Sequence, residues 1–302
     1  MVPVVQKGIN AHLRLSPTIH YEYVDKNCLW IFDSEENSRL AEKQLDDRGI
    51  KGWEIVDKEK VRELEPDLSD KVVSGIVLTG LYQGDSRQMC AGLAKNLEAS
   101  GSTILTSAEA TSFSTHSDTI EKVSLADGRS FAADYFVVSS GAWSQSLGTS
   151  IKYSIPTFPV KGHMLDYATS SVTVSHLLYT GKLMVRSTVR GGIRVGSTRD
   201  YSGFEKTVNE RAANRMQVQA EKFLPKLKTN EPEVWTGLRP GSPDGWPIIG
   251  FPKSYHNLFL ATGHFHEGFT LAAYTGEIVA ESIKNPEYPW ESKELCDPDR
   301  FN

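Results

Sequence analysis

Residues 257–276 read NLFLATGHFHEGFTLAAYTG, and this stretch decides the architecture of the chain. Its apolar start predicts a buried strand that ends at Gly263, and apolar residues spaced three and four apart predict a helix that opens at Gly268. A glycine at a strand end lets the backbone approach a ligand closely. The helix start offers free N–H groups and a positive dipole end, which suit a group that gains negative charge. A plain strand–turn–helix corner that only serves packing explains the same residues equally well.

A second apolar run, YFVVSSG at 135–141, predicts another buried strand, and its carboxyl end opens at Gly141. A helix capped by Asp85 and a hairpin around residues 127–128 precede this strand. Residues 151–204, by contrast, contain several segments typical of β-strands. A strand–helix–strand piece therefore precedes a β-rich piece, and a strand–helix piece closes the chain.

This order predicts two interleaved domains, with an α/β plus α+β architecture overall. We expect one domain to combine residues 1–83 and 151–234 around a mixed or antiparallel sheet. The other domain, of α/β type, combines residues 84–150 and 235–302.

Local patterns predict several further elements. Asp33 with a glutamate three residues later predicts the start of a helix over 34–48. Residues 102–106, STILT, are typical of a strand, and residues 204–224 of a long helix. The first twenty residues show no clear periodicity.

Composition excludes several classes of protein. The 302 residues carry 33 Lys+Arg against 38 Asp+Glu, a net charge of −5, which disfavours binding to nucleic acid. No apolar run approaches the ~20 residues that span a bilayer, and no secretory signal is evident. Three widely spaced cysteines favour neither a disulfide framework nor a metal site. These features predict a cytoplasmic protein, or an organellar one if a targeting segment precedes the sequence.

Residues 237–250, GLRPGSPDGWPIIG, contain the most distinctive basic residue, Arg239. Its guanidinium is a planar fork that matches a carboxylate, and it stands at the end of a predicted strand among apolar residues. This position indicates either a carboxylate-binding residue or a surface ion pair. The Gly and Pro residues around it are mixed with bulky apolar ones, which predicts a structured loop rather than a linker.

Five blocks in the chain together resemble the family of FAD-dependent enzymes that contains D-amino-acid oxidase and glycine oxidase. The similarity runs in family order from about residue 20 and is nearer to glycine oxidase than to sarcosine oxidase. The blocks are YFVVSSGAWSQSLG (135–148), TFPVKGHML (157–165), GGIRVGSTRDYSG (191–203), WTGLRPGSPDGWPIIG (235–250) and NLFLATGHFHEGFTLAAYTGEIVAESI (257–283).

This resemblance implies an incomplete, doubly wound FAD-binding domain formed by 84–150 and 235–302, and a substrate domain formed by 1–83 and 151–234. It implies oxidation of the C–N bond of a small amino or imino acid, with hydride transfer to flavin N5. The FAD is expected to be noncovalent, because no cysteine lies near the loop that follows Arg239.

The resemblance also assigns site residues. Arg239 matches the arginine that holds the substrate carboxylate, and no residue is required as a strong general base. The positions matched to FAD are Ala110, Gly141, Gly263, His264, Phe265, His266, Glu267, Gly268, Phe269 and Thr270. His266 also faces the substrate, where glycine oxidase has an arginine. Met184 falls where glycine oxidase has a substrate-binding tyrosine, and Tyr179 is an alternative source of that hydroxyl.

One departure from the family is large. The chain contains no GxGxxG turn, which cradles the FAD pyrophosphate in the family. We therefore expect a partner chain or a further segment to supply the dinucleotide-binding unit. The alternative function is a non-catalytic subunit or assembly factor that keeps the fold without the cofactor. The retained blocks around Arg239 and Gly268 oppose that alternative, because ligand chemistry explains them best.

Overall fold

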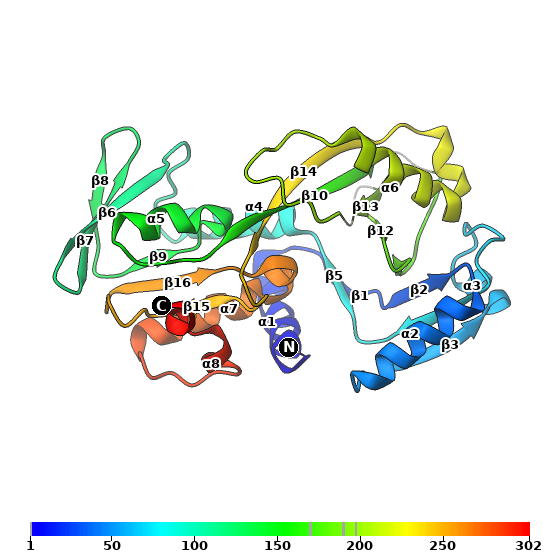
Figure 1. Cartoon of the computed structure of the whole chain (residues 1–302), viewed down its shortest axis with the longest axis horizontal. Helices are drawn as coiled ribbons and strands as arrows, with labels where there is room; N and C mark the ends of the chain where they lie inside the picture. Colours follow the sequence, from blue (N-terminus) through cyan, green and yellow to red (C-terminus); the bar gives the residue numbers. More distant parts are fainter. Residues whose placement is uncertain (1, 169–170, 189–190, 197) are drawn as a thin grey trace.

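The computed structural model describes residues 2–168, 171–188, 191–196 and 198–302. The molecule is elongated, with a large sheet at one end and smaller sheets at the other (Figure 1). The two terminal regions meet near the middle, where the first helix lies beside the long C-terminal helix.

Eight α-helices and sixteen strands lie in the described part of the chain. The helices are α1 (Val2–Ile19), α2 (Glu35–Asp47), α3 (Lys58–Leu64), α4 (Ser86–Ala99), α5 (Ser144–Ser150), α6 (Glu210–Phe223), α7 (Gly268–Lys284) and α8 (Lys293–Cys296). The strands are β1 (Tyr23–Asp25), β2 (Cys28–Phe32), β3 (Trp53–Asp57), β4 (Ser74–Leu78), β5 (Tyr82–Gly84), β6 (Ala110–His116), β7 (Thr119–Leu125), β8 (Ser130–Ala132), β9 (Phe136–Val138), β10 (Phe158–Tyr167), β11 (Leu177–Tyr179), β12 (Met184–Ser187), β13 (Ile193–Gly196), β14 (Glu233–Gly241), β15 (Ile248–Gly250) and β16 (Leu258–Thr262).

The large sheet has eight strands in the order β14-β10-β13-β12-β11-β2-β4-β3. Its strands pair antiparallel except for β11 with β2. Along these strands side chains alternate between two faces. Leu165, Val185 and Val195 point into a core that includes Met216 and Phe223 of α6. On β10, β12 and β13 the opposite face carries Asp166, Arg186 and Arg194 and is free to form a site, whereas on β2 and β4 it packs against α2.

Three short strands form a second sheet in the order β15-β16-β9, in which β9 runs parallel to β16. Leu258 and Leu260 of β16 pack with Phe136 and Val138 of β9 in one core. Phe259 points to the other side, where α7 covers it. A third sheet, β6-β7-β8, completes this end of the molecule. The fold class expected from the sequence is thus present, with strand β9 at the edge of its sheet.

Helix α1 is an element that the sequence reading did not anticipate. It packs along α7, and its buried positions recur with helical spacing at Val4, Gly8, Ala11 and His12. A Cβ on Gly8 would lie 2.3 Å from the carbonyl oxygen of Thr270, so glycine allows the two helices to touch. The pattern was hidden because small and polar residues occupy most of the buried face.

Three local predictions need correction. The N-cap of α2 is Ser34, not Asp33, because Ser34 Oγ accepts the Asn37 N–H at 3.3 Å. Residues 102–106 form no strand, since no described strand lies alongside and their apolar side chains are exposed. Helix α6 begins six residues later than expected, at Glu210, and the side chain of Asn209 caps it by accepting the Ala212 N–H.

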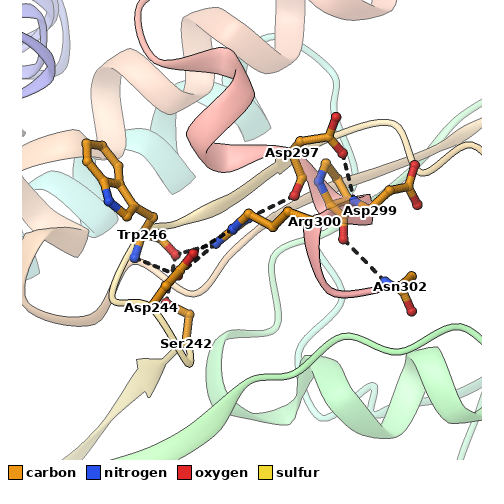
Figure 2. A network of polar contacts seen from close by, with 8 residues as sticks. Ser242, Asp244, Trp246, Asp297, Asp299, Arg300 and Asn302 are labelled. Atoms are coloured by element: carbon orange, nitrogen blue, oxygen red, sulfur yellow. Dashed lines mark hydrogen bonds and ion pairs between the residues drawn. The ribbon is translucent and has the colours of Figure 1, made fainter.

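The loop after β14 is structured, as predicted, and the C-terminal residues hold it (Figure 2). Arg300 donates from Nε and Nη2 to both carboxylate oxygens of Asp244, at 2.8 and 3.1 Å, and from Nη2 to the Trp246 carbonyl at 2.9 Å. Ser242 Oγ donates to the same carbonyl at 2.7 Å. These bonds fix the chain just beyond the strand that carries Arg239.

Candidate functional site

A cavity of about 570 Å³ lies between the polar face of the large sheet and the start of α7. Residues 265–267 form a short 3-10 helix, η3 (Phe265–Glu267), between β16 and α7. Strands of the large sheet, η3 and α7 all contribute residues to the cavity, although they are far apart in the sequence. Its lining residues are Met164, Leu177, Tyr179, Met184, Arg186, Arg194, Gly196, Thr198, Arg199, Arg239, His266, Glu267 and Thr270.

Arg239 reaches this cavity because glycine stands beside it on the neighbouring strand. A Cβ on Gly162 of β10 would lie 2.3 to 2.6 Å from three atoms of the Arg239 guanidinium. The guanidinium therefore lies directly against the backbone of β10. Its Nη1 donates to the Thr198 carbonyl at 2.9 Å, and no carboxylate pairs with it among the described residues. Burial, and then the charge of Arg199, lower the pKa of Arg239.

His163 helps to position Arg239 indirectly, through Thr198. Its ring Nε2 accepts the Asn209 N–H at 2.9 Å, so the proton of the neutral ring lies on Nδ1. Nδ1 then donates to Thr198 Oγ1 at 2.8 Å, and the His163 N–H donates to the same oxygen at 2.7 Å. Burial lowers the pKa of His163, which keeps the ring neutral. The ring thus holds Thr198, whose carbonyl in turn holds Arg239.

His266 and Glu267 form the opposite wall. Burial, together with the charges of Arg199 and Arg239, lowers the pKa of His266 to about 4. Its imidazole is therefore neutral near pH 7 and contributes hydrogen bonds rather than charge. Burial also raises the pKa of Glu267, although a hydrogen bond with Thr270 opposes this shift.

Arg194 is the lining arginine with a strong ion pair. It donates to both carboxylate oxygens of Asp166 at 2.7 Å, and Trp235 Nε1 donates to the same carboxylate at 3.1 Å. Burial works to raise the pKa of Asp166, but these donors hold it below its usual value. Arg194 and Arg87 both lie over the Trp235 ring, at 5.3 and 5.6 Å from its centroid. The ion pair with Asp166 therefore holds the Arg194 guanidinium in place beside the cavity.

The structure brings together five of the site residues predicted from the sequence. They come from β12, β14, η3 and α7, and they all line this cavity. They are Met184, Arg239, His266, Glu267 and Thr270. Tyr179 lines it as well, but its hydroxyl donates to the Gly181 carbonyl at 3.0 Å.

Other predicted residues of the same turn lie around the cavity without lining it. Gly263 has φ +73°, a conformation that favours glycine. His264 donates or accepts a hydrogen bond with Thr275 Oγ1 at 3.0 Å, and burial lowers its pKa to about 4. Phe265 lies under Arg199, whose Cζ is 5.8 Å from the ring centroid.

Gly268 and Phe269 begin α7, and they differ in role. Phe269 points away from the cavity, toward the rings of His12 and Tyr23. A Cβ on Gly268 would touch nothing closer than His264 Cβ, at 3.8 Å. The helix start has no side-chain cap at Glu267. No described side chain therefore competes with a ligand for its first N–H groups.

Ala110 lies in a second cavity, of about 320 Å³, beside β9. Val137, Ser139 and Ser140 line it too, and Gly141 follows them with φ +60°. A Cβ on Gly141 would meet no atom within 4 Å. This open glycine, together with the uncapped start of α7, is the kind of backbone surface that an extended dinucleotide needs. The residues present therefore fit FAD.

Comparison with known proteins identifies the chain. The model of the FAD dependent oxidoreductase family, DAO, matches residues 1–282. The chain belongs to this family. A D-amino acid dehydrogenase from Vibrio atlanticus (strain LGP32) is 31% identical over 296 residues, which cover 94% of this chain and 70% of that protein. A glycine oxidase from Pseudomonas aeruginosa is 33% identical over 155 residues, which are 51% of this chain and 43% of that protein.

Solved structures show the same fold. The glycine oxidase from Geobacillus kaustophilus superposes with a TM-score of 0.90 and 22% identity, covering 100% of this chain and 83% of that one. The L-proline dehydrogenase from P. horikoshii gives 0.86 and 20%, over 99% and 82%. The family and the fold class predicted from the sequence are thus confirmed, as is the membership of an FAD-binding oxidoreductase family.

Three lining arginines were missed by the sequence reading: Arg186, Arg194 and Arg199. A signal for two of them was present. In KLMVRSTV and GGIRVGST, Arg186 and Arg194 alternate with buried valines, so they belong to the face opposite the core. The register then sets Arg186 directly opposite Arg194.

None of the helices described is long and apolar enough to cross a membrane. Within the part of the chain that the structure describes, no three His, Cys, Asp or Glu side chains gather as metal ligands would.

Proposed function

We propose that this protein takes part in the FAD-dependent oxidation of the C–N bond of a small amino or imino acid. Arg239 binds the substrate carboxylate, and η3 with the start of α7 faces the flavin. When bound, FAD supplies the acceptor for the hydride that leaves the amine-bearing carbon. The names of the relatives, a D-amino acid dehydrogenase and a glycine oxidase, support this substrate class.

One observation carries the proposal: a guanidinium without an ion-pair partner among the described residues shares a cavity with an uncapped helix start. If Arg239 binds the substrate carboxylate, the other atoms of the substrate lie between the sheet and His266. The neutral imidazole of His266 can accept a hydrogen bond from the substrate amine, which a cationic side chain there could not do. Met184 contributes an apolar surface but no donor.

The FAD would lie along residues that the structure leaves open. We assign its flavin to residues 263–270 and its remaining part to Gly141 and the cavity of Ala110. The described residues that line the cavity of Arg239 include no cysteine, which supports a noncovalent cofactor. Gly268→Val tests the assignment, because an added Cβ would meet nothing closer than His264 Cβ, at 3.8 Å. We expect normal folding but lost flavin retention, whereas full retention would contradict the assignment.

We also propose that a partner chain or a further segment supplies a dinucleotide-binding unit beside β9. Strand β9 pairs with β16 on one side, and the described residues provide no strand for its other edge. Val137 on this short strand is 42% exposed. Gel filtration of the chain with excess FAD tests the idea. Flavin absorbance that co-elutes with the chain alone would show that no further unit is needed.

Anaerobic titration tests the reaction itself. A small amino or imino acid added to the flavin-loaded protein should bleach the visible flavin bands. Arg239→Gln should raise the concentration needed for half-bleaching at least about tenfold, since a charged hydrogen-bonded pair is lost. Arg39→Gln, on the exposed face of α2, is the matched control for charge. Bound flavin that no amino or imino acid bleaches would favour the alternative, a subunit or assembly factor without catalysis.

Two expectations from the sequence stay predictions. The cytoplasmic location rests on composition alone. The division into a substrate domain of residues 1–83 and 151–234 and an FAD-binding domain of 84–150 and 235–302 is the other. Helix α1 packs beside α7, and β14 crosses the last boundary within the large sheet.

A further inference from the structure

The charges that line the cavity of Arg239 are strongly unbalanced. Four arginines face it from β12, β13, β14 and the chain after β13, and Glu267 is the acidic residue that lines it. Asp166 neutralises Arg194 through two short hydrogen bonds. Arg186, Arg199 and Arg239 have no ion pair within the described residues, and residues 1, 169–170, 189–190 and 197 include no acidic one. The cavity therefore has a surplus of positive charge.

Arg186 is the least expected member of this group, because it is largely shielded from water. Its contact is a long one, from Nη1 to the Gly84 carbonyl at 3.5 Å. Burial, and then the charge of Arg194, lower its pKa, although the charges of Asp85, Glu22 and Asp166 oppose this shift. A shielded cation without a close partner is costly, and its cost falls when a ligand brings the missing negative charge.

The two shielded arginines enter the cavity from different ends. Arg239 on β14 lies opposite Val160 of β10. Arg186 on β12 lies opposite Arg194 of β13, and Arg194 in turn lies opposite Asp166 of β10. The two shielded arginines are thus three strands apart across the sheet and six residues apart along β10. This separation of the two strand positions favours a different anionic group at each guanidinium. An ordinary amino acid zwitterion brings one carboxylate and one ammonium group, and so leaves the charge surplus unchanged.

We infer that the substrate carries a second acidic group, which Arg186 binds while Arg239 binds the carboxylate next to the amine. The substrate class is an amino or imino acid with two carboxylates joined by a carbon or carbon–nitrogen chain. This inference rests on the proposed function for the reaction, but the binding of a two-carboxylate ligand does not depend on it.

A chain-length series tests the inference without any turnover. Calorimetry on the protein as isolated compares malonate, succinate, glutarate and adipate with monocarboxylates of equal chain length, at constant ionic strength and chloride. We expect the best dicarboxylate to bind at least about tenfold more tightly than its monocarboxylate match, since each carboxylate–guanidinium pair is a charge-assisted contact. Equal affinities across the series would overturn the inference.

Variants assign the effect to Arg186. Arg186→Met should remove the preference for the dicarboxylate and leave monocarboxylate affinity within about twofold, whereas Arg186→Lys should restore part of it. Arg39→Gln on the surface of α2 should change neither affinity. If Arg186→Met weakens flavin retention and leaves the dicarboxylate preference intact, the charge serves the cofactor and the inference is wrong.

The inference and the proposed function fail separately. A dicarboxylate preference that depends on Arg186, in a protein whose bound flavin no amino acid bleaches, would sustain the inference and refute the reaction. Bleaching by glycine at concentrations equal to those of amino acids with two carboxylates would sustain the reaction and refute the inference.

Discussion

Gly162 should control substrate affinity although it cannot touch the substrate through a side chain. In Gly162→Ala the new Cβ would overlap the Arg239 guanidinium, which lies 2.3 to 2.6 Å from the ideal Cβ position. The guanidinium is the far end of a flexible side chain and can move, whereas the paired backbone of β10 cannot. We therefore expect the strand to stay and the guanidinium to leave its place above it.

The expected loss is specific to binding. A charge-assisted hydrogen bond to a carboxylate contributes ~1.5–3 kcal/mol, so its loss should weaken carboxylate binding about 10- to 100-fold. Stability should change little. The displaced guanidinium releases the Thr198 carbonyl, at a cost of about 1 kcal/mol, while alanine restricts the unfolded chain and offsets about half of that or more.

Calorimetric titration with a small carboxylate and a thermal melt separate the two effects. Gly237→Ala is the matched control, because Gly237 lies directly opposite Gly162 on β14 and its added Cβ would meet only Trp235, at 3.6 Å. Gly162→Ala should also add nothing in a protein that already carries Arg239→Gln. Wild-type affinity in Gly162→Ala, or an equal loss in Gly237→Ala, would refute the reasoning.

Three further predictions concern stability. Asn257→Ala should lower the free energy of unfolding by about 2 kcal/mol in thermal or denaturant melts. The buried Asn257 amide accepts the Ile120 N–H at 2.8 Å and donates to the Ile120 carbonyl at 2.9 Å. A change under about 0.5 kcal/mol would contradict this prediction. Asp166→Asn should destabilise by about 1–3 kcal/mol through the lost partner of Arg194, and the loss should shrink in high salt if the charge is responsible. The His264 pKa of about 4, below its ordinary 6.5, means that the unfolded chain binds more protons between these values, so stability should fall as pH drops from about 6.5 to 4. His264→Gln should flatten that part of the profile, and an unchanged slope would show that other groups cause it.

Much of the fold follows from local patterns that the final packing respects. The strand 258–262, the helix from Gly268 and the cap at Asp85 occur where the sequence places them. Residues 102–106 fail for a physical reason. A β-forming segment becomes a strand only beside a partner, and the sequence of the segment does not reveal whether one is there.

The candidate site also depends on contacts between distant residues that the sequence does not reveal. Arg239 could be selected as a ligand-binding residue because its surroundings in the sequence are unusual. The partners that position it could not, because Gly162 and Thr198 reach it through the register of β10 with β14 and through the chain that follows β13. Those contacts join residues about 40 and 80 positions apart, and no periodicity or spacing encodes them.

The alternation of the large sheet links the site to the core. Val185 and Val195 fill the buried face, and the residues next to them, Arg186 and Arg194, face the cavity. A slip of one residue in either strand would put a guanidinium in the core and a valine in the cavity. The core therefore selects the register, and the register in turn sets the spacing of the cations. For this reason the charge pattern of the cavity should tolerate conservative core substitutions, which keep the register, better than insertions of a single residue in β12 or β13.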